Sequence, residues 1–204
     1  MTGLTITPAT DSSGDFTLSV TATSTDGADT ATATASLDVS VGAVANTPIL
    51  ATDAASGDED SAIPLDISAA LTDGSKPLSV IITAIPAGAV LSAGTLNLDG
   101  SVTLTPDQLA GFTITPPADS DVDFTLSVTA TSTDGSDTAS TTASLDVTVA
   151  AVADTPTLTT TAASGDEDTA IALDISSALA DLDGSEALEV TITGIPDGAT
   201  LSAI

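Results

Sequence analysis

An internal repeat with a period of 108 residues constrains the fold of this chain more than any other feature. The stretch "GLTITPATDSSGDFTLSVTATSTDG" from Gly3 returns as "GFTITPPADSDVDFTLSVTATSTDG" from Gly111. Of the 48 positions in residues 3–50, 36 are identical to those 108 residues further on. Two extra residues near Asp181 then lengthen the displacement to 110. Self-similarity at a fixed period is typical of repeat architectures, so the chain contains one structural unit several times.

The sequences "NTP" and "DTP" mark the repeat boundaries. We expect residues 1–46 to be the C-terminal part of one β-sandwich repeat, residues 47–154 a complete repeat, and residues 155–204 the N-terminal part of a third. The first residue is the counterpart of Leu109, in the middle of a repeat. The sequence is therefore expected to be a window on a longer array.

Within the complete repeat, apolar and polar residues alternate with the period of two that is typical of half-buried strands. The clearest cases are "FTLSVTAT" from Phe124 and "ASLDVTV" from Ala143. Further strands are expected at about 49–54, 62–67, 78–85, 89–91, 101–104 and 112–115, separated by turns such as "SGDED", "TDGS" and "STDG". One helical turn is expected at "TPDQLAG", with Thr105 as N-cap and Pro106 first in the helix. Seven or eight short strands per repeat predict an all-β fold of tandem immunoglobulin-like or cadherin-like β-sandwich repeats.

The charge balance excludes several classes of function. The chain has 29 acidic residues and one basic residue, Lys76, with no histidine and no cysteine. Nucleic acids and anionic membranes are poor partners because both are bound through Lys and Arg. Acid–base and nucleophilic catalysis would have to use carboxylates and hydroxyls alone, so we expect no enzyme activity.

The apolar content shows that the high negative charge does not mean disorder here. The chain is 42% hydrophobic, enough for a core of small and branched side chains. No apolar run approaches the roughly 20 residues of a membrane span, and "MTGLTITP" lacks the basic start of a signal peptide. If the protein is exported, we expect its address to lie outside this sequence.

The predicted strand order brings acidic loops together. In such a sandwich the first, third and fifth loops and the exit linker share one end, and the next repeat presents its own loop there. Nine carboxylates would then converge on the second joint, the one between residues 47–154 and 155–204: Asp58, Glu59 and Asp60 of "SGDED", Asp119, Asp121 and Asp123 of "ADSDVD", Asp154 of the linker, and Asp181 and Asp183 of "DLDGS". Without a counter-ion they would repel one another strongly. Ca²⁺ takes six to eight oxygen ligands in flexible loops, so we expect Ca²⁺ as the cofactor.

A simpler interpretation stays open for each loop. Asp-Gly is a common turn pair, and any one of these loops can be a solvated turn. The run "DSDVD" is not an EF-hand, because no glycine occupies its sixth position and its twelfth is Ala130 in place of glutamate. The calcium hypothesis depends on the convergence of several loops at one joint.

The first joint, between residues 1–46 and 47–154, differs from the second at three positions, and every change removes negative charge or adds positive charge. Asn46 stands in place of Asp154, Ser13 in place of Asp121, and Lys76 in place of Glu186. The loop "LTDGSK" is also two residues shorter than "LADLDGSE". These changes predict a weakened or absent cation site, with Lys76 as a tethered substitute. Drift in an unconstrained loop is the alternative.

The long motifs resemble a known family. "SGDEDTAIALDISSALADLDGSEALEVTITGIPDGATLSA", "LTPDQLAGFTITPPADSDVDFTLSVTATSTDG" and "AVADTPTL" look like the cadherin-like tandem repeats in the extension region of giant, type I secreted, RTX-type adhesins of Gram-negative bacteria. The resemblance covers essentially the whole chain. It implies an extracellular protein retained at the cell surface, whose repeats project a distal adhesive domain while Ca²⁺ stiffens the array.

The resemblance also implies a ligand set. Cadherin-like joints would use Glu59 from the first loop, Asp119 and Asp121 from the fifth, Asp154 from the linker, and Asp181 and Asp183 from the next module. The glycine-rich nonapeptide calcium motif of RTX toxins and a C-terminal secretion signal are both absent from this sequence. The stretch is therefore expected to be spacer.

Two functions and one kind of partner follow as expectations. The first function is that of a spacer whose calcium-loaded joints set reach and stiffness. The alternative is a module that binds a glycan, ice or another surface through the outward threonines of "TATSTD" and "TATATAS". The expected partners are neighbouring repeats of the same chain. Head-to-tail self-association through the incomplete ends is also expected, because their apolar strand faces would lack a partner sheet.

Overall fold

The computed structural model of the chain describes residues 3–72 and 76–202. It is almost entirely β, with a single turn of 3-10 helix, η1, among the described residues. The strands are β1 (Phe16–Asp26), β2 (Asp29–Val39), β3 (Ile49–Thr52), β4 (Ala55–Asp58), β5 (Ile63–Pro64), β6 (Ile67–Ala70), β7 (Leu78–Thr83), β8 (Val90–Leu91), β9 (Thr95–Leu96), β10 (Val102–Leu104), β11 (Thr113–Thr115), β12 (Phe124–Asp134), β13 (Asp137–Ala150), β14 (Thr157–Thr161) and β15 (Asp174–Ala178); η1 is Pro106–Leu109.

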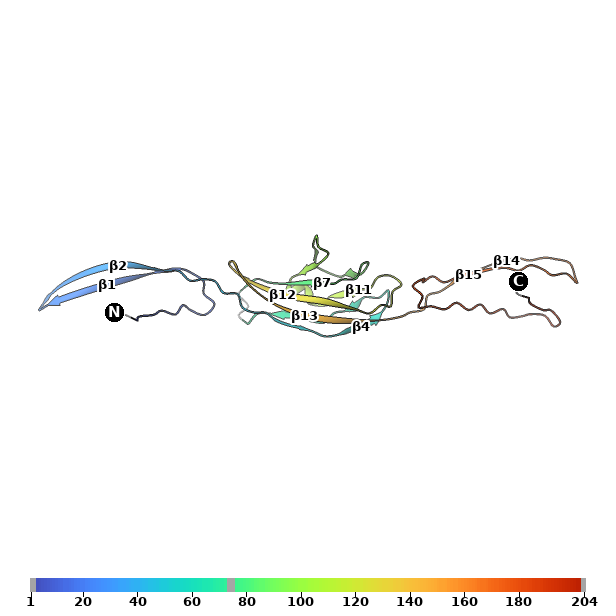
Figure 1. Cartoon of the computed structure of the whole chain (residues 1–204), viewed down its shortest axis with the longest axis horizontal. Helices are drawn as coiled ribbons and strands as arrows, with labels where there is room; N and C mark the ends of the chain where they lie inside the picture. Colours follow the sequence, from blue (N-terminus) through green and yellow to red (C-terminus); the bar gives the residue numbers. More distant parts are fainter. Residues whose placement is uncertain (1–2, 73–75, 203–204) are drawn as a thin grey trace.

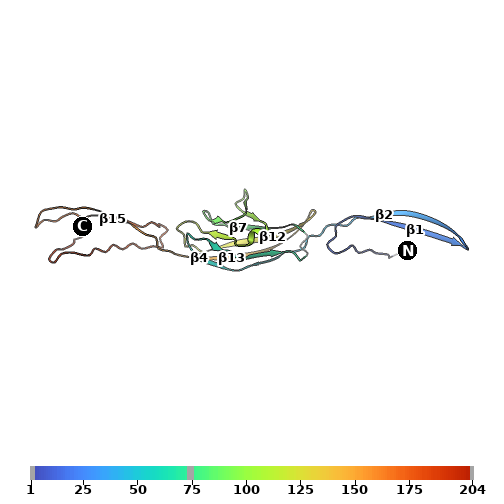
Figure 2. The same ribbon diagram turned by 180° about the vertical axis from the view of Figure 1, so that it is seen from behind.

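The molecule is drawn out along one axis (Figure 1). Strands β3 to β13 form a central body, the β1–β2 hairpin extends from one end of it, and β14 and β15 lie beyond the other end. The view from behind shows the same linear order (Figure 2). The two ends of the chain therefore lie on opposite sides of the central body.

The largest sheet of the central body has six strands in the order β4-β13-β12-β7-β10-β9. Strand β12 pairs antiparallel with both β13 and β7, in a register that sets Val128 opposite Ile82. Strand β4 instead pairs parallel with β13, from Ala55 opposite Val147 to Asp58 opposite Ala150. A three-stranded sheet, β5-β11-β8, and a two-stranded sheet, β3-β6, complete the body.

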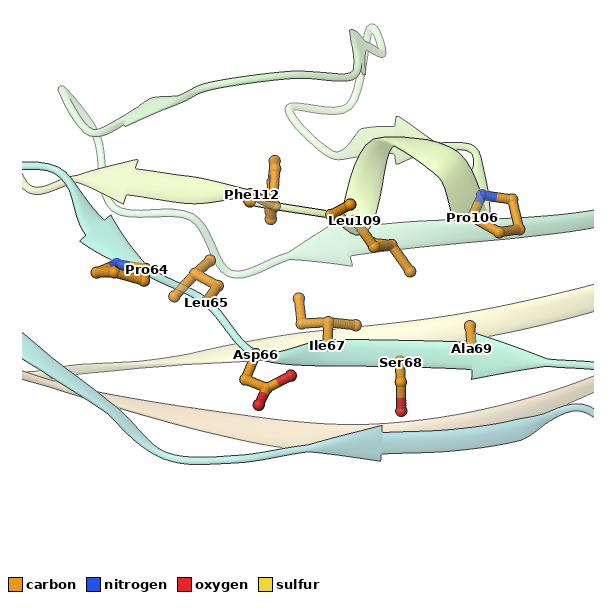
Figure 3. A pocket seen from close by; sticks show the side chains of 11 residues that line it. Pro64, Leu65, Asp66, Ile67, Ser68, Ala69, Pro106, Leu109 and Phe112 are labelled. Carbon is orange, nitrogen blue, oxygen red and sulfur yellow. The ribbon is translucent and has the colours of Figure 1, made fainter.

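The core lies between the six-stranded sheet and the segments from β5, β6, η1 and β11. Alternate residues of β12, Leu126, Val128 and Ala130, are fully buried, which is the expected pattern for a strand with one face on the core. Phe112 and Ile114 are buried in the same cluster. Around the hollow between β6 and η1, Leu65 and Ile67 point towards the core side chains while Asp66 and Ser68 point the other way (Figure 3).

Most predicted strands are present, with three differences. The strand expected at 49–54 is present as β3, but the chain then crosses to pair with β13 as a further strand, β4, that was not predicted. The predicted turn "SGDED" therefore begins inside β4. The strand expected at 62–67 is divided between β5 and β6, and β9 was not predicted. The helical turn is confirmed as η1, where the Thr105 backbone N–H donates to Oε1 of Gln108 at 2.8 Å.

The parts outside residues 47–154 have fewer partners. Val20 of β1 is 52% exposed, whereas its counterpart Val128 in β12 is 0% exposed. Residues 188–193 are the counterpart of β7 but form no strand, because β7 is held by β12 and β10 and the counterparts of those strands are not beside them. Most of the turn predicted at 72–75 lies outside the described residues. Among the described residues, no helix has the length and apolar character needed to span a bilayer.

Candidate metal site

Six of the nine predicted carboxylates meet at the second joint, in two groups of three. Glu59, Asp181 and Asp183 each offer an oxygen, and these oxygens all lie within 4.8 Å of one another. The second group, Asp60, Asp119 and Asp154, has the same spacing. We call these groups the inner triad and the outer triad. Each contains residues from segments far apart in the sequence, so the fold itself assembles them.

Strand β4 positions Glu59 in the inner triad. The parallel ladder of β4 and β13 continues one residue further, where the Glu59 backbone N–H donates to the carbonyl oxygen of Ala150 at 3.0 Å. This contact places the side chain beside the exit linker, and the Val152 backbone N–H donates to Oε1 of Glu59 at 2.6 Å. Glu59 is only 3% exposed, and its Oε2 is buried without a hydrogen-bond partner among the described residues.

The surroundings of Glu59 are acidic, and among the described residues the groups that repel its charge are other carboxylates. The hydrogen bond from the Val152 backbone lowers its pKa, but burial and repulsion from Asp181, Asp183 and Asp60 more than offset this, so the pKa of Glu59 lies above its usual value. A buried carboxylate oxygen with neither donor nor cation is costly. The position of Glu59 is therefore favourable only with a proton or a cation.

The "DLDGS" loop folds on itself to present the other two carboxylates of the inner triad. The backbone N–H of Asp183 donates to Oδ1 of Asp181 at 2.8 Å, and the Ser185 N–H donates to Oδ1 of Asp183 at 2.7 Å. Ser185 Oγ also donates to Oδ2 of Asp181 at 3.2 Å. The Ser185 hydrogen bonds hold the pKa of Asp183 below its usual value. Asp181 is buried and Asp183 is exposed, so the loop spans the edge of the joint.

The outer triad is more accessible to solvent. Asp60 and Asp119 are exposed and Asp154 is half-buried. Oδ1 of Asp60 accepts the backbone N–H of Asp119 at 3.0 Å, which ties the first and fifth loops together. Burial, followed by repulsion from Asp60, raises the pKa of Asp119 above its usual value.

Two members of the outer triad have a left-handed backbone, with φ of 56° at Asp60 and 52° at Asp119. Their counterparts in the other repeats, Asp168 and Asp11, have φ of 60° and 59°. Aspartate tolerates this conformation in turns. The conformation therefore belongs to the turn sequence that the repeats share, and it does not identify a ligand.

Three predicted residues lie outside both triads. Asp58 is an exposed residue of β4. Asp123 is also exposed, and its Oδ1 accepts the backbone N–H of Val149 at 2.8 Å, which is a structural role. Asp121 is half-buried and approaches the site through its backbone, which helps to lower the pKa of Asp183.

Glu186 was not predicted as a site residue, yet it contacts the linker directly. Its Oε1 accepts a hydrogen bond from the backbone N–H of Asp154. Its Oε2 is buried and, within the described parts of the chain, has no hydrogen-bond partner. The signal in the sequence was the replacement of this glutamate by Lys76 at the first joint.

The first joint is held by hydrogen bonds between protein groups. Asn46 Nδ2 donates to Oδ1 of Asp11 at 3.0 Å, where the second joint has the carboxylates of Asp154 and Asp119. The linker also binds the β12–β13 hairpin, since Ser132 Oγ donates to the Asn46 carbonyl oxygen at 2.5 Å. An amide donor beside a carboxylate needs no cation between them.

Lys76 does not neutralise the acidic loops, as a tethered substitute for a cation would; it pairs with Asp134. Its Nζ lies 2.9 Å from Oδ2 of Asp134, and the two side chains are 13% and 10% exposed. Asp134 ends β12, so this ion pair lies within residues 47–154. Lys76 therefore ties the segment before β7 to the β12–β13 hairpin. In the linker of the first joint, the neutral Asn46 takes the place of an acidic residue.

The oxygen chemistry of the triads fits a hard divalent cation. Two ligands of one Ca²⁺ at 2.3–2.6 Å can lie up to about 5 Å apart, which matches oxygens within 4.8 Å of one another. The hollow between β6 and η1 does not fit a metal, because Asp66 is the one carboxylate among the residues that line it (Figure 3).

Comparison with known proteins does not identify a family for this chain. No model of a known protein family matches the chain, and none of the curated proteins compared with it matches either.

Proposed function

We propose that the chain is a run of structural spacer repeats from an extracellular bacterial surface adhesin, and that Ca²⁺ stiffens its second joint. Each complete repeat would be a cadherin-like or immunoglobulin-like sandwich, and the array would hold a distal adhesive domain away from the cell of a Gram-negative bacterium. The linear order of the three parts supports this function, because repeats joined end to end gain length with each copy (Figure 1).

Glu59 is the observation that carries the calcium proposal. Its carboxylate is 3% exposed, has an unpartnered oxygen within the described residues, and faces Asp181 and Asp183 of the following repeat. A cation at this position would bind oxygens from both sides of the joint at once. Binding would therefore remove the repulsion and fix the angle between the repeats.

Small-angle scattering on the chain, extended at each end so that both outer repeats are complete, tests the proposal. With Ca²⁺ at about a few millimolar, above the dissociation constants of about 10⁻⁴ to 10⁻³ M at which extracellular modules bind it, we expect a rod of fixed length. Chelation should shorten the mean end-to-end distance, because bending would occur at the unloaded second joint. Identical scattering curves with and without Ca²⁺ would overturn the proposal.

A matched pair of variants separates the site from the overall charge. Glu59→Gln removes one charge from the inner triad and should eliminate calorimetric Ca²⁺ binding at this joint. Asp58→Asn removes one charge from the adjacent exposed residue, which belongs to neither triad. If Asp58→Asn weakened binding as much as Glu59→Gln, the attraction would be diffuse, and the triad would not be a site.

A further inference from the structure

The end of the β12–β13 hairpin packs against the segment that leads into the central body. The turn between the two strands lies at the end of the central body that faces the β1–β2 hairpin (Figure 1). Three side chains near this turn bind main-chain groups of residues 45–48, and they belong to Ser132, Asp137 and Thr141. We call these three residues the latch, and residues 43–48 the first linker.

Two latch residues donate hydroxyl groups to carbonyl oxygens of the first linker. Ser132 Oγ donates to Asn46 at 2.5 Å, and Thr141 Oγ1 donates to Pro48 at 2.7 Å. Ser132 is fully buried, and Ala45 and Pro48 are buried as well. A buried hydroxyl group needs a hydrogen-bond partner, and Ser132 finds it on a residue of the preceding repeat. The first linker is therefore packed as part of the interior.

The third latch residue supplies a charged acceptor. Oδ2 of Asp137 accepts the backbone N–H of Ala45 at 2.9 Å, and a carboxylate makes this hydrogen bond stronger than one between neutral groups. Asp137 lies opposite Asp134 in the β12–β13 register, and Nζ of Lys76 lies 2.9 Å from Oδ2 of Asp134. The lysine therefore offsets one of the two negative charges at the end of the hairpin, beside the contact that holds Ala45.

Asn46 is bound by both repeats at once. Its side-chain Nδ2 donates to Oδ1 of Asp11 in the preceding repeat, while its carbonyl oxygen accepts the hydroxyl of Ser132 in the central body. At the second joint, the groups that meet from the two repeats are carboxylates, which cannot hydrogen-bond to one another when they are ionised. The first joint thus has direct hydrogen bonds on both sides of its linker.

We propose that the latch fixes the direction of the first linker without a metal ion, so that residues 1–46 and the central body keep one relative orientation in the absence of Ca²⁺. Its three hydrogen bonds all end on main-chain groups, so the latch binds the backbone path of the linker and does not depend on the side chain at position 46. The proposal concerns the first joint alone and does not rest on calcium binding at the second.

The repeat sequence retains part of the latch in another copy. Ser24 and Asp29 are the counterparts of Ser132 and Asp137, whereas Ala33 stands in place of Thr141. The linker sequences "VANTP" from Val44 and "VADTP" from Val152 differ only at the residue whose side chain the latch does not bind. The latch is therefore a property of the repeat, and its strength is set by the copy that supplies the hairpin.

Amide hydrogen exchange of the full 204-residue chain in chelator tests the charged contact. The Ala45 N–H should be protected in the wild-type chain, and Asp137→Ala should lower this protection about tenfold or more, because the N–H loses a charged acceptor. Asp137→Asn keeps a side-chain oxygen and should retain most of the protection. Ser136→Ala is the matched control at an exposed residue of the same turn.

The exchange of a core amide separates loss of the latch from loss of the fold. Val128 is fully buried, and its N–H should stay protected in every variant. Exchange of the wild-type Ala45 N–H at the rate of an unfolded peptide would overturn the proposal. Equal protection of Ala45 in Asp137→Ala and in Ser136→Ala would overturn it as well.

A distance measurement between two spin labels by pulsed electron paramagnetic resonance tests the orientation of the joint. The chain has no cysteine, so labels can be attached through Ser36→Cys in β2 and Leu98→Cys, a fully exposed residue of the central body. In chelator we expect one narrow distance distribution. It should broaden when the three latch side chains are removed together by Ser132→Ala, Asp137→Ala and Thr141→Ala, and the single Asp137→Ala variant should give an intermediate width.

A label pair within the central body is the control for this measurement. Leu98→Cys with Thr148→Cys, an exposed residue of β13, should give the same narrow distribution with and without the latch. Equal widths for the pair across the joint in the wild-type and latch-free chains would overturn the proposal. Both measurements are made in chelator at the first joint, so their outcome is separate from that of Ca²⁺ binding at the second.

Discussion

The two joints of this chain have the same place in the repeat but differ in how the negative charge of their aspartates is balanced. The first joint places the amide of Asn46 beside Asp11, 3.0 Å from donor to acceptor, and binds its linker to the β12–β13 hairpin. The second joint concentrates two carboxylate triads, with an unpartnered oxygen on buried Glu59 among the described residues. A few substitutions thus separate a joint that is complete by itself from one that requires a proton or a cation.

The difference is informative because the backbone pattern is shared. Asp11 and Asp119 are counterparts with nearly the same φ, 59° and 52°. The turn therefore has nearly the same backbone in both repeats, and the side chains around it decide how much negative charge gathers there. If Ca²⁺ stiffens the second joint as proposed, an array of such repeats can contain both calcium-independent and calcium-dependent joints without a change of fold.

The largest expected effect concerns the ion pair of the central body. Lys76→Met should lower the free energy of unfolding by about 3 kcal/mol, because it leaves the Asp134 side chain, 10% exposed, without its cation. Urea denaturation followed by circular dichroism measures this loss. Lys76→Arg keeps the charge and should retain most of the stability. A loss below about 0.5 kcal/mol, the level of surface pairs, would contradict a structural role for Lys76.

The next effect concerns the second joint. Asp181→Asn combined with Asp183→Asn should abolish the calcium-dependent stabilisation, which is about 2.7 kcal/mol when Ca²⁺ is at 100 times its dissociation constant. Calorimetric melting with Ca²⁺ and with chelator measures the difference. Asp123→Asn is the control, since Asn keeps an oxygen that can accept the Val149 N–H. If the double variant kept its calcium response, the inner triad would not be the binding site.

A smaller effect is expected when the first joint is made to resemble the second. Asn46→Asp replaces the donor to Asp11 by a second carboxylate, so stability in chelator should fall by about 1 kcal/mol. Ca²⁺ should restore part of this loss and should leave the wild-type first joint unchanged. Chemical shifts of residues around Asp11 in labelled protein report the change. An unchanged melting temperature in chelator would show that the Asn46 amide does not stabilise the joint.

The smallest expected effect is a dependence on pH in the absence of cations. The pKa values of Glu59 and Asp119 are raised, so the folded state binds more protons than the unfolded state. Stability in chelator should therefore fall as pH rises through these raised values, from the ordinary carboxylate range upwards. Asp183, with a lowered pKa, contributes stability that is lost only as pH falls below its ordinary value of 3.8.

Thermal melting between pH 4 and pH 7 in chelator measures this slope. Glu59→Gln with Asp119→Asn should flatten it, and saturating Ca²⁺ should reverse it, because deprotonated ligands bind the cation. A slope of the opposite sign in chelator would show that these two carboxylates are not the dominant titrating groups.

Much of the fold was accessible from sequence because its signals are local or periodic. Alternation in "FTLSVTAT" predicted β12, and Thr105 and Pro106 predicted η1. The division of residues 49–58 into β3 and β4 was not predictable in this way. Strand β4 contains Ser56, Gly57 and Asp58, which read as a turn, and it forms because β13 offers it a parallel partner.

The sequence predicted where the candidate site lies, but not how its side chains are arranged. Strand order placed the acidic loops at one joint, and the structure brings six of the nine carboxylates into two triads. Periodicity could not show that Asp123 would accept the Val149 N–H, nor that Glu186 would bind the linker. These roles depend on side-chain direction at the ends of strands, which is set by tertiary packing.

The parallel pairing of β4 with β13 also determines how the central body would respond to tension. The chain enters β4 from the side of the first joint, and it leaves β13 towards the second joint. A pull along the axis would draw the two strands in opposite directions along their length. The hydrogen bonds from Ala55 to the Glu59 N–H would then be loaded together in shear, instead of opening one at a time like a zip. The central body should therefore resist an axial pull better than a sideways one.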